Sequence, residues 1–276
     1  MEFSVDPEIF ARLHGIRLAV VVARGVDNRA GRSAVDEAWS SAWAAAAGSA
    51  APYGNAQSHP RVLAWRQRLQ AIGVSMRHFP TSIEALLRRA MKGGTPFRIN
   101  PLVDFYNAVS LRHTVPVGGF DLDRVPEPLA VRLTREGDTF SALDADGSVP
   151  VPLGEIAYAT GRTVLTRQLM WRQAREGLIY PETRSVFLVS ESLPETGPGV
   201  AGWAITDRSP ADARRRVIDH APRRRPAACR EGARRSRDRR RIPCLAAPVS
   251  MWPVRPSVVR AREPVQAPVS RGRRDD

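Results

Sequence analysis

The sequence predicts an α+β fold for residues 1–205, and three observations support this class. Before Pro116, apolar residues recur at the three- and four-residue spacing of helices. After Pro116, the chain changes to short runs of β-branched and aromatic residues, separated by turn-forming residues. Helices and strands do not alternate along the chain, which argues against a doubly wound parallel sheet.

The first half is predicted to contain one strand and several helices. The apolar run 16–23, which ends before Gly25, is typical of a buried strand. Ser33 is the expected N-cap of an Ala- and Trp-rich helix, and Thr81-Ser82-Ile83-Glu84 has the pattern of a capping box. Gly93 and Gly94 are expected to end the helix that begins there. After a short start at residues 3–10 with Pro7 in a first helical turn, the predicted helices are 33–50, 60–72, 81–91 and 101–111.

The second half is predicted to contain short strands. Two turn-forming segments, Glu136-Gly137-Asp138 and Asp144-Ala145-Asp146-Gly147, separate some of them. The apolar and β-branched runs predict strands at residues 130–133, 140–143, 155–159, 163–169 and 185–190.

The net charge of +14 lies almost entirely in the last quarter of the chain. Residues 1–205 hold 22 Lys and Arg against 20 Asp and Glu, whereas residues 206–276 hold 20 Arg against 8 acidic residues. No apolar run approaches the roughly 20 residues that cross a bilayer, and acidic residues stand near the start. We therefore expect a soluble, cytoplasmic protein whose main domain is nearly neutral.

Residues 206–276 are predicted to be a disordered tail rich in Arg and Pro. With 9 of the 23 Pro residues in this segment, helices and strands would be interrupted repeatedly. Such mixed Arg, Pro, Ala and Val runs also arise when a GC-rich gene is read out of frame, so a genuine tail and a frameshift product both stay open. The only two cysteines, Cys229 and Cys244, lie here with no metal-binding spacing.

The stretch 93–123 carries the most informative motif. Val103-Asp104 and Asn107 lie on a predicted helix, and Pro116 and Phe120-Asp121-Leu122 follow. This pattern resembles a signature of the B3/B4 tRNA-binding and editing domain of the phenylalanyl-tRNA synthetase beta chain. Further similarity lies in Val20–Asn28, Thr166–Arg172 and Pro181–Val189, so the resemblance covers about residues 1–200 in order.

The resemblance implies a mixed α/β sandwich, present here as a free-standing domain. In the synthetase this domain hydrolyses tyrosine wrongly attached to phenylalanine tRNA, in a pocket that accepts the aminoacyl adenosine end. We therefore expect an RNA-binding protein whose partner is tRNA or aminoacyl-tRNA and which hydrolyses mischarged tRNA in trans. The synthetase has a histidine where this chain has Gly118. That departure motivates an alternative, a non-catalytic module that binds an amino acid or another small ligand.

The first group of candidate ligand-binding residues comes from the motif itself. Arg98 suits a phosphate or carboxylate, or else an ion pair with Asp104 or Glu84. Asn100 is interpreted chiefly as a helix cap, whereas Asp104 and Asn107 serve either a pocket or the structure. Gly118 would let a ligand approach the backbone. The central hypothesis is that four side chains help to close one pocket: Asp104, Asn107, Phe120 and Asp121.

The second group lies later in the chain. Arg167, Trp171 and Arg172 form a cluster that would stack on a base and hold phosphates, or else place Trp171 in the core with exposed arginines. Glu182 and Thr183 would orient a water on an ester, or else form a turn before a strand. The turn Gly93-Gly94-Thr95-Pro96 is interpreted as a helix end more readily than as a phosphate loop.

Other chemistries find little support. The histidines within the predicted fold have no metal-ligand spacing, and no Gly-x-Ser-x-Gly elbow is present. We expect no metal and no cofactor, and no catalytic residue is assigned. Twenty arginines in residues 206–276 would also bind nucleic acid without sequence preference.

Overall fold

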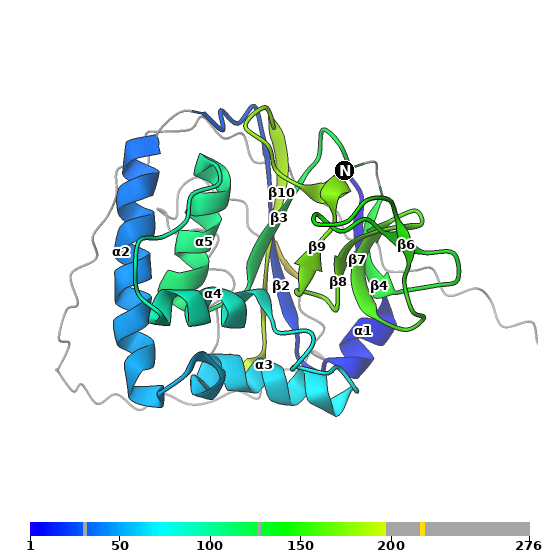
Figure 1. The fold of residues 1–276 in the computed structure, drawn as a ribbon. Coiled ribbons are helices and arrows are strands. Elements are labelled where there is room, and N and C mark those ends of the chain that lie inside the picture. The colour runs from blue at the N-terminus through cyan, green and yellow to red at the C-terminus, as the bar shows by residue number, and fades with distance from the viewer. Residues whose placement is uncertain (30–31, 126–127, 197–215, 219–276) are drawn as a thin grey trace, which may run out of the picture.

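A computed structural model describes residues 1–29, 32–125, 128–196 and the strand at 216–218. The described elements form three layers (Figure 1): helices, a first sheet and a second sheet. Helices α2 (Arg32–Ala50), α4 (Ser82–Met91) and α5 (Pro101–His113) make up the helical layer. Helices α1 (Pro7–Arg12) and α3 (Pro60–Ala71) lie at the base of the layers. This arrangement confirms the mixed α/β class.

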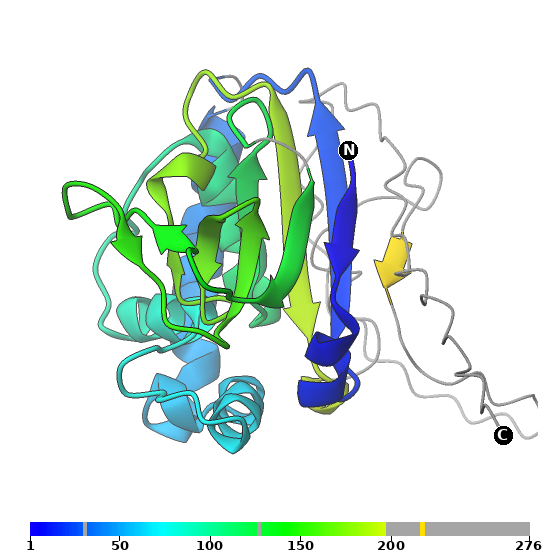
Figure 2. The same cartoon turned by 90° about the vertical axis from the view of Figure 1, so that its right-hand side faces the viewer.

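The first sheet has the order β11-β2-β10-β3 and is antiparallel throughout. Its strands are β2 (Arg17–Arg24), β3 (Val117–Asp121), β10 (Ser185–Ser192) and β11 (Arg216–Ile218). Figure 2 shows β11 in yellow on the outer side of β2. Strand β11 corrects the prediction of a wholly disordered tail, because edge pairing uses backbone groups that composition does not reveal. The rest of 206–276 lies outside the described residues.

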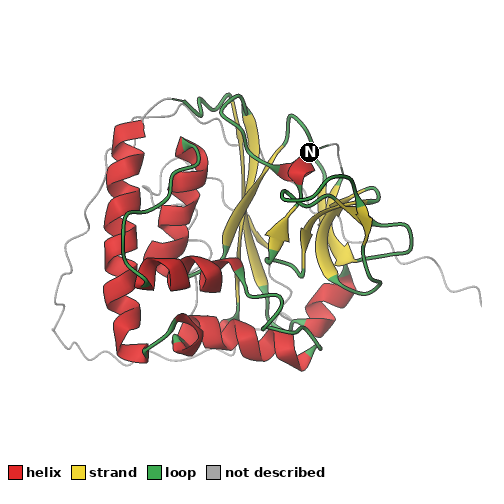
Figure 3. Ribbon diagram, in the orientation of Figure 1, coloured by secondary structure: helices red, strands yellow, loops and turns green. Residues whose placement is uncertain are grey.

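The second sheet has the order β1-β4-β7-β8-β5-β6, with β9 also paired to β8. The β1–β4 and β5–β8 pairs are parallel, whereas the other pairs are antiparallel. Figure 3 shows its short strands on the side of the first sheet opposite the long helices. Its strands are β1 (Phe3–Val5), β4 (Leu129–Leu133), β5 (Thr139–Phe140), β6 (Val149–Pro150), β7 (Ile156–Thr160), β8 (Thr163–Arg167) and β9 (Arg172–Gln173).

The main apolar core fills the space between the two sheets. Phe120 of β3 and Phe187 of β10 stack with ring centroids 6.1 Å apart, and Phe120 also meets Tyr158 of β7 at 5.4 Å. On the other face of the first sheet, Leu102 and Val103 of α5 pack against residues of β2 and β10. Strand β10, in the middle of the first sheet, is therefore buried on both faces.

Most predicted elements are confirmed, with shifted ends. Helix α2 begins at Arg32, so Ser33 is inside the helix and is not its N-cap; Arg32 pairs with Asp36 one turn later at 3.0 Å. The predicted strand 140–143 ends at Phe140. The strand predicted at 163–169 ends at Arg167, because Gln168 and Leu169 adopt left-handed conformations. Five strands of the described residues were not predicted: β1, β3, β6, β9 and β11.

Two predicted caps are confirmed because they depend on local contacts. The Thr81 hydroxyl accepts the backbone N–H of Glu84 at 3.3 Å. A capping box would also place the Glu84 carboxylate on the backbone N–H of Thr81, and this part of the prediction is wrong. The Glu84 carboxylate instead accepts hydrogen bonds from the Arg66 guanidinium at 2.9 and 3.0 Å. Gly93 and Gly94 follow α4 with φ of 75° and 81°, as expected of residues that end a helix.

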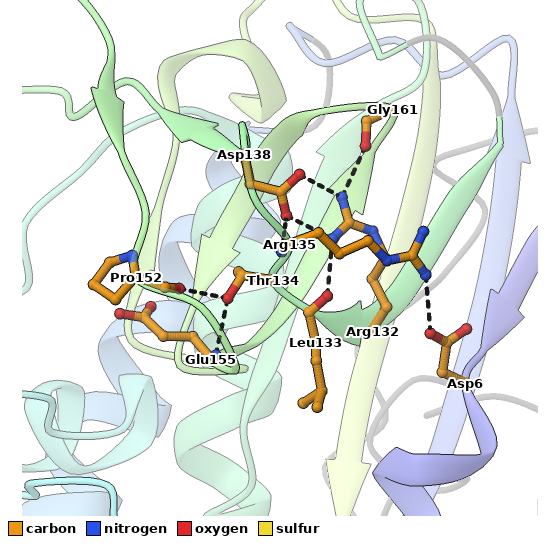
Figure 4. A network of polar contacts seen from close by, with 9 residues as sticks. All are labelled: Asp6, Arg132, Leu133, Thr134, Arg135, Asp138, Pro152, Glu155 and Gly161. Atoms are coloured by element: carbon orange, nitrogen blue, oxygen red, sulfur yellow. Dashed lines mark hydrogen bonds and ion pairs between the residues drawn. The ribbon is translucent and has the colours of Figure 1, made fainter.

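A buried polar network holds the turn between β4 and β5 (Figure 4). The Arg132 guanidinium donates to both carboxylate oxygens of Asp138, at 2.6 and 3.0 Å, and to the carbonyls of Leu133 and Gly161. Asp138 also accepts the backbone N–H of Arg135 at 2.8 Å. The neighbouring Thr134 hydroxyl accepts the backbone N–H of Glu155 and so fixes the start of the β7 segment.

Candidate functional site

The end of β3 is tied to the loop that precedes β10. Thr183 donates its hydroxyl to the buried Asp121 carboxylate at 2.5 Å, and the same hydroxyl oxygen accepts the backbone N–H of Tyr180 at 2.9 Å. Asp121 also accepts the backbone N–H of Asp123 at 2.8 Å. Strand β3 and residues 180–183 therefore form one fixed rim.

Two buried asparagines attach this rim to the helical layer. Asn100 caps α5 by accepting the backbone N–H of Val103 at 3.1 Å, and donates its amide to the Ile179 carbonyl at 3.0 Å. Asn28 donates to Asn100 at 3.0 Å and to the Tyr180 carbonyl at 2.7 Å. The predicted capping role of Asn100 is confirmed, and its side chain also positions the loop at 179–180.

A shallow hollow of about 400 Å³, largely open to solvent, lies beside this rim and is lined by Arg124, Arg175, Glu176 and Tyr180. The Arg124 guanidinium carbon lies 4.1 Å from the centre of the Tyr180 ring, and its Nε is 3.7 Å from the Asp121 carboxylate. Arg175 donates to the carbonyls of Ala142 and Ala145, at 3.2 and 2.7 Å. Two positive groups, one carboxylate and one aromatic ring therefore line the opening.

Two adjacent glycines in β3 have different surroundings. A Cβ added to Gly119 would lie 2.6 Å from the Leu188 side chain, whereas one added to Gly118 would meet no atom within 4 Å. Gln173 donates its amide to the carbonyls of Gly119 and Gly177, at 2.8 and 2.7 Å, and so joins β3 to the segment that lines the hollow. Packing requires a glycine at 119, but the space above 118 is open.

The outer edge of β3 presents backbone groups. The Leu122 N–H bonds to the Ser185 carbonyl at 2.9 Å, which sets the alternation of paired and unpaired residues along the ladder. With this alternation the N–H and C=O of Gly119 point away from β10, consistent with the bond from Gln173 to the Gly119 carbonyl. The N–H of Gly119 therefore points toward the same side as the hollow-lining segment.

Two carboxylates near the rim are held ionised. The hydrogen bond from Arg29, at 2.7 Å, lowers the pKa of the exposed Glu182. Burial alone would raise the pKa of Asp123, but backbone N–H bonds from Arg184 and Ser185 bring it below its usual value. Negative charge is therefore present at the rim near neutral pH.

Comparison with known proteins bears on this arrangement. Residues 64–197, which include β3, the rim and the hollow, match the family model described as the B3/4 domain. The predicted B3/4 resemblance, which covered about residues 1–200, is confirmed for residues 64–197. We refer to residues 64–197 as the B3/4 region.

A solved structure gives a weaker likeness. It is the N-terminal fragment of the phenylalanyl-tRNA synthetase beta subunit from Pyrococcus horikoshii, with 10% sequence identity and a TM-score of 0.36. The alignment covers 80% of this chain and 54% of that fragment, so the chain spans about half the length of the solved structure. The sequence matches no curated protein.

A second cluster in the B3/4 region contains Arg167, Trp171 and Arg172. Arg167 is bonded to Glu155, with Nε 2.9 Å from Oε2, whereas Arg172 pairs at the surface with Asp144 at 3.1 Å. The Arg167 and Arg172 guanidinium carbons lie 5.6 and 5.3 Å from the Trp171 ring centre. Trp171 itself is half-buried, so it is neither a fully buried core residue nor a fully exposed platform for a base.

A third group lies between α2 and α5. Arg98 pairs with Asp36, so the expected pairing with Asp104 or Glu84 is wrong. The buried Asp104 accepts the Ile99 N–H at 3.0 Å and lies 2.9 Å from an Arg32 nitrogen. Burial raises the pKa of Asp104, opposed by these same two contacts. Asn107 is half-buried, and within the described residues its side chain has no hydrogen-bond partner.

The predicted site residues thus fall into separate places. Gly118, Glu182 and Thr183 belong to the rim, and Asn100 joins the rim to α5. The Phe120 side chain, although on β3, lies in the core between the sheets. The four side chains of the central hypothesis do not line the hollow. Sequence reasoning missed Asn28, Gln173 and the residues that do line it, because their roles arise only from contacts between distant segments. The position of Arg124 just after Phe120-Asp121-Leu122-Asp123 was the one available local indication.

The described ranges also bear on the requirements of a membrane-spanning helix and of a metal site. In them, none of the helices has both the length and the apolar character needed to cross a bilayer. Nor, within the same ranges, do three His, Cys, Asp or Glu side chains gather as a metal site would require.

Proposed function

We propose that the B3/4 region binds RNA and holds the aminoacylated adenosine end of a tRNA in the hollow beside β3. The observation that carries this proposal is the hollow beyond the end of β3, the strand that contains Phe120 and Asp121 of the B3/4 motif. The hollow is lined by Arg124, Arg175, Glu176 and Tyr180. The B3/4 family is linked to the phenylalanyl-tRNA synthetase beta chain, which supports a tRNA partner.

Arg124 is the residue best suited to hold the ligand. Its side chain is about half exposed, and within the described residues its Nη groups donate no hydrogen bond. Stacking on Tyr180 orients the planar guanidinium without using those donors. These Nη groups would donate charge-assisted hydrogen bonds to a phosphate or to an ester carbonyl.

Hydrolysis in trans would follow from positioning rather than from a nucleophile. Water would attack the ester that joins the amino acid to the ribose, and the ribose hydroxyl would leave with a proton. The ionised Glu182 of the rim would orient that water, and Arg124 would stabilise the developing oxyanion. The Gly119 N–H is a further donor available at the same edge.

A deacylation assay tests the proposal directly. Full-length protein is incubated with tRNAs mischarged with tyrosine and with other amino acids, and the acid-precipitable label is followed. We expect release that depends on Arg124, with R124A at least tenfold slower. R135A, which changes an exposed arginine bonded to Asp6, should act as the wild type. The absence of both hydrolysis and tRNA retention would remove the proposal.

The alternative is a non-catalytic module that binds an amino acid or another small ligand. The open space above Gly118, where the resemblance places a histidine, favours this alternative. A G118H variant separates the two functions, because the added side chain meets no atom near its Cβ. If hydrolysis rises in G118H, the hollow is an editing site that lost one group. If only amino acids raise the melting temperature, and no variant hydrolyses any ester, the small-ligand module is correct.

A further inference from the structure

An arginine–aromatic patch lies apart from the hollow. We define the stacking patch as Phe79, Arg167, Trp171 and Arg172. Phe79 comes from the loop between α3 and α4, and its ring meets Trp171 edge-on with centroids 4.8 Å apart. The Ser82 N–H bonds to the Met170 carbonyl at 2.9 Å, which joins the start of α4 to the residue before Trp171. Both rings are half-buried, so each presents part of its surface to solvent.

The two arginines of the patch differ in how firmly they are held. Arg167 is largely buried and is bonded to Glu155 through both Nε and Nη2. The polar network of Figure 4 fixes Glu155 through Thr134. Arg172 is about half exposed and pairs only with the exposed Asp144 among the described residues. Because exposed ion pairs contribute little free energy, Arg172 can leave Asp144 for a phosphate at low cost.

Charge is distributed unevenly around the patch. Residues 51–103 hold eight Lys and Arg but one acidic residue, Glu84, whereas the other residues up to 205 hold 14 Lys and Arg against 19 acidic residues. Glu84 is buried and bonded to Arg66, so it adds no exposed negative charge. Arg77, Arg88 and Lys92 are exposed, and within the described ranges they form no ion pair. The surface formed by the loop and α4 is therefore positive and borders the two rings.

We infer that the stacking patch binds unpaired nucleotides of RNA, with a base stacked on Trp171 and a neighbouring phosphate on Arg172. An aromatic ring flanked by arginines, next to a positive surface, has the chemistry of a single-strand binding platform. The inference rests on the proposed function in taking RNA as the ligand, but it concerns different residues and needs no amino acid. Strand β9 runs from Arg172 to Gln173, and the Gln173 amide bonds to the Gly119 carbonyl, so the backbone joins the patch to β3 through two adjacent residues.

The test compares two oligonucleotides that carry the same charge. Full-length protein is titrated against a labelled single-stranded RNA of about eight nucleotides and against an abasic strand of equal length, by fluorescence anisotropy. Residues 206–276 attract the phosphates of both strands equally, so the affinity ratio reports contacts to bases. We expect the wild type to prefer the base-containing strand by about tenfold, with W171A losing most of that preference and W171F keeping it.

Two results would overturn the inference: equal wild-type affinity for the two strands, or an unchanged ratio in W171A. If W171A does not fold, as judged by circular dichroism, W171L and R172A decide the matter in the same titration. R172A should weaken binding and reduce the slope of log affinity against log salt by about one, whereas R135A should change neither.

The outcomes for the two sites are distinguishable. R124A should lose deacylation while keeping the preference for bases, because Arg124 lines the hollow and is not in the patch. W171A should lose the preference while still hydrolysing a short aminoacyl-nucleotide mimic. Loss of both properties in either single variant would mean that the patch and the hollow are one site, and the separate patch would be rejected.

Discussion

Arg132, in the turn between β4 and β5, and Arg124, in the hollow, show two uses of the same side chain. Arg132 is 6% exposed, and its N–H groups donate hydrogen bonds to Asp138 and to two backbone carbonyls within the protein. Arg124 is 54% exposed, stacks on Tyr180 and approaches Asp121 only at 3.7 Å. An arginine whose N–H groups all face protein acceptors stabilises the fold. An arginine oriented by an aromatic ring has N–H groups that can still bind a ligand.

The largest expected effect comes from breaking the enclosed pair. R132M removes the charge that compensates Asp138, and leaving a buried carboxylate unpaired costs about 3–5 kcal/mol. Chemical denaturation of the variant measures the free energy of unfolding. The volume-matched double variant R132M/D138L should recover much of the loss. A loss below about 1 kcal/mol in R132M would contradict the structural role assigned to the network.

Glu191 sharpens the comparison, because it is a buried carboxyl with a tyrosine rather than an arginine beside it. Burial raises its pKa to about 7, opposed by the hydrogen bond from Tyr158. Because the folded protein holds this proton more tightly than the unfolded chain, the contribution to stability is complete below the unfolded pKa near 4.5. This contribution is lost as the pH rises to the folded pKa of about 7. We expect wild type to lose about 3 kcal/mol over this window, and E191Q to lose less. Identical pH profiles for the two proteins would reject the assignment.

The asparagines of the rim should give a smaller effect. N100A removes the cap of α5 and leaves the Ile179 carbonyl and Asn28 without this partner. We expect a loss of about 1–2 kcal/mol in thermal or chemical unfolding. N55A removes an exposed cap of a short 3-10 helix and is the matched control, with an expected loss nearer 0.5 kcal/mol. Equal losses would mean that the buried bridge to the rim adds nothing.

The smallest stability change should come from the arginine of the hollow. R124A removes an exposed side chain, so its free energy of unfolding should stay within about 0.5 kcal/mol of wild type. The preference for aminoacylated over uncharged tRNA should nevertheless be lost, as measured by comparing the retention of the two forms. If R124A destabilised the fold as much as R132M does, the distinction between the two arginines would not hold.

Local patterns predicted the elements well, and the site poorly. Thr81 and Asn100 were identified as caps because each bonds within three residues of itself. Strand β3 was missed because Gly118 and Gly119 carry no β-forming side chain, and only pairing with β10 reveals it. Arg98 was given the wrong partner because Asp36 lies on a helix remote in sequence. The same reason hid Tyr180 and Gln173, whose contacts cross more than 50 residues.

The position of β2 sets a limit on how the chain can be divided. This strand pairs with β10 along eight residues of each, yet residues 17–24 precede the B3/4 region at 64–197. Helix α2, also outside that region, covers α5 with Trp39 and Trp43. A fragment cut at the family boundary would expose the β10 edge and bare the apolar surface of α5. Such a fragment should aggregate, so the segment that can fold on its own is longer than residues 64–197.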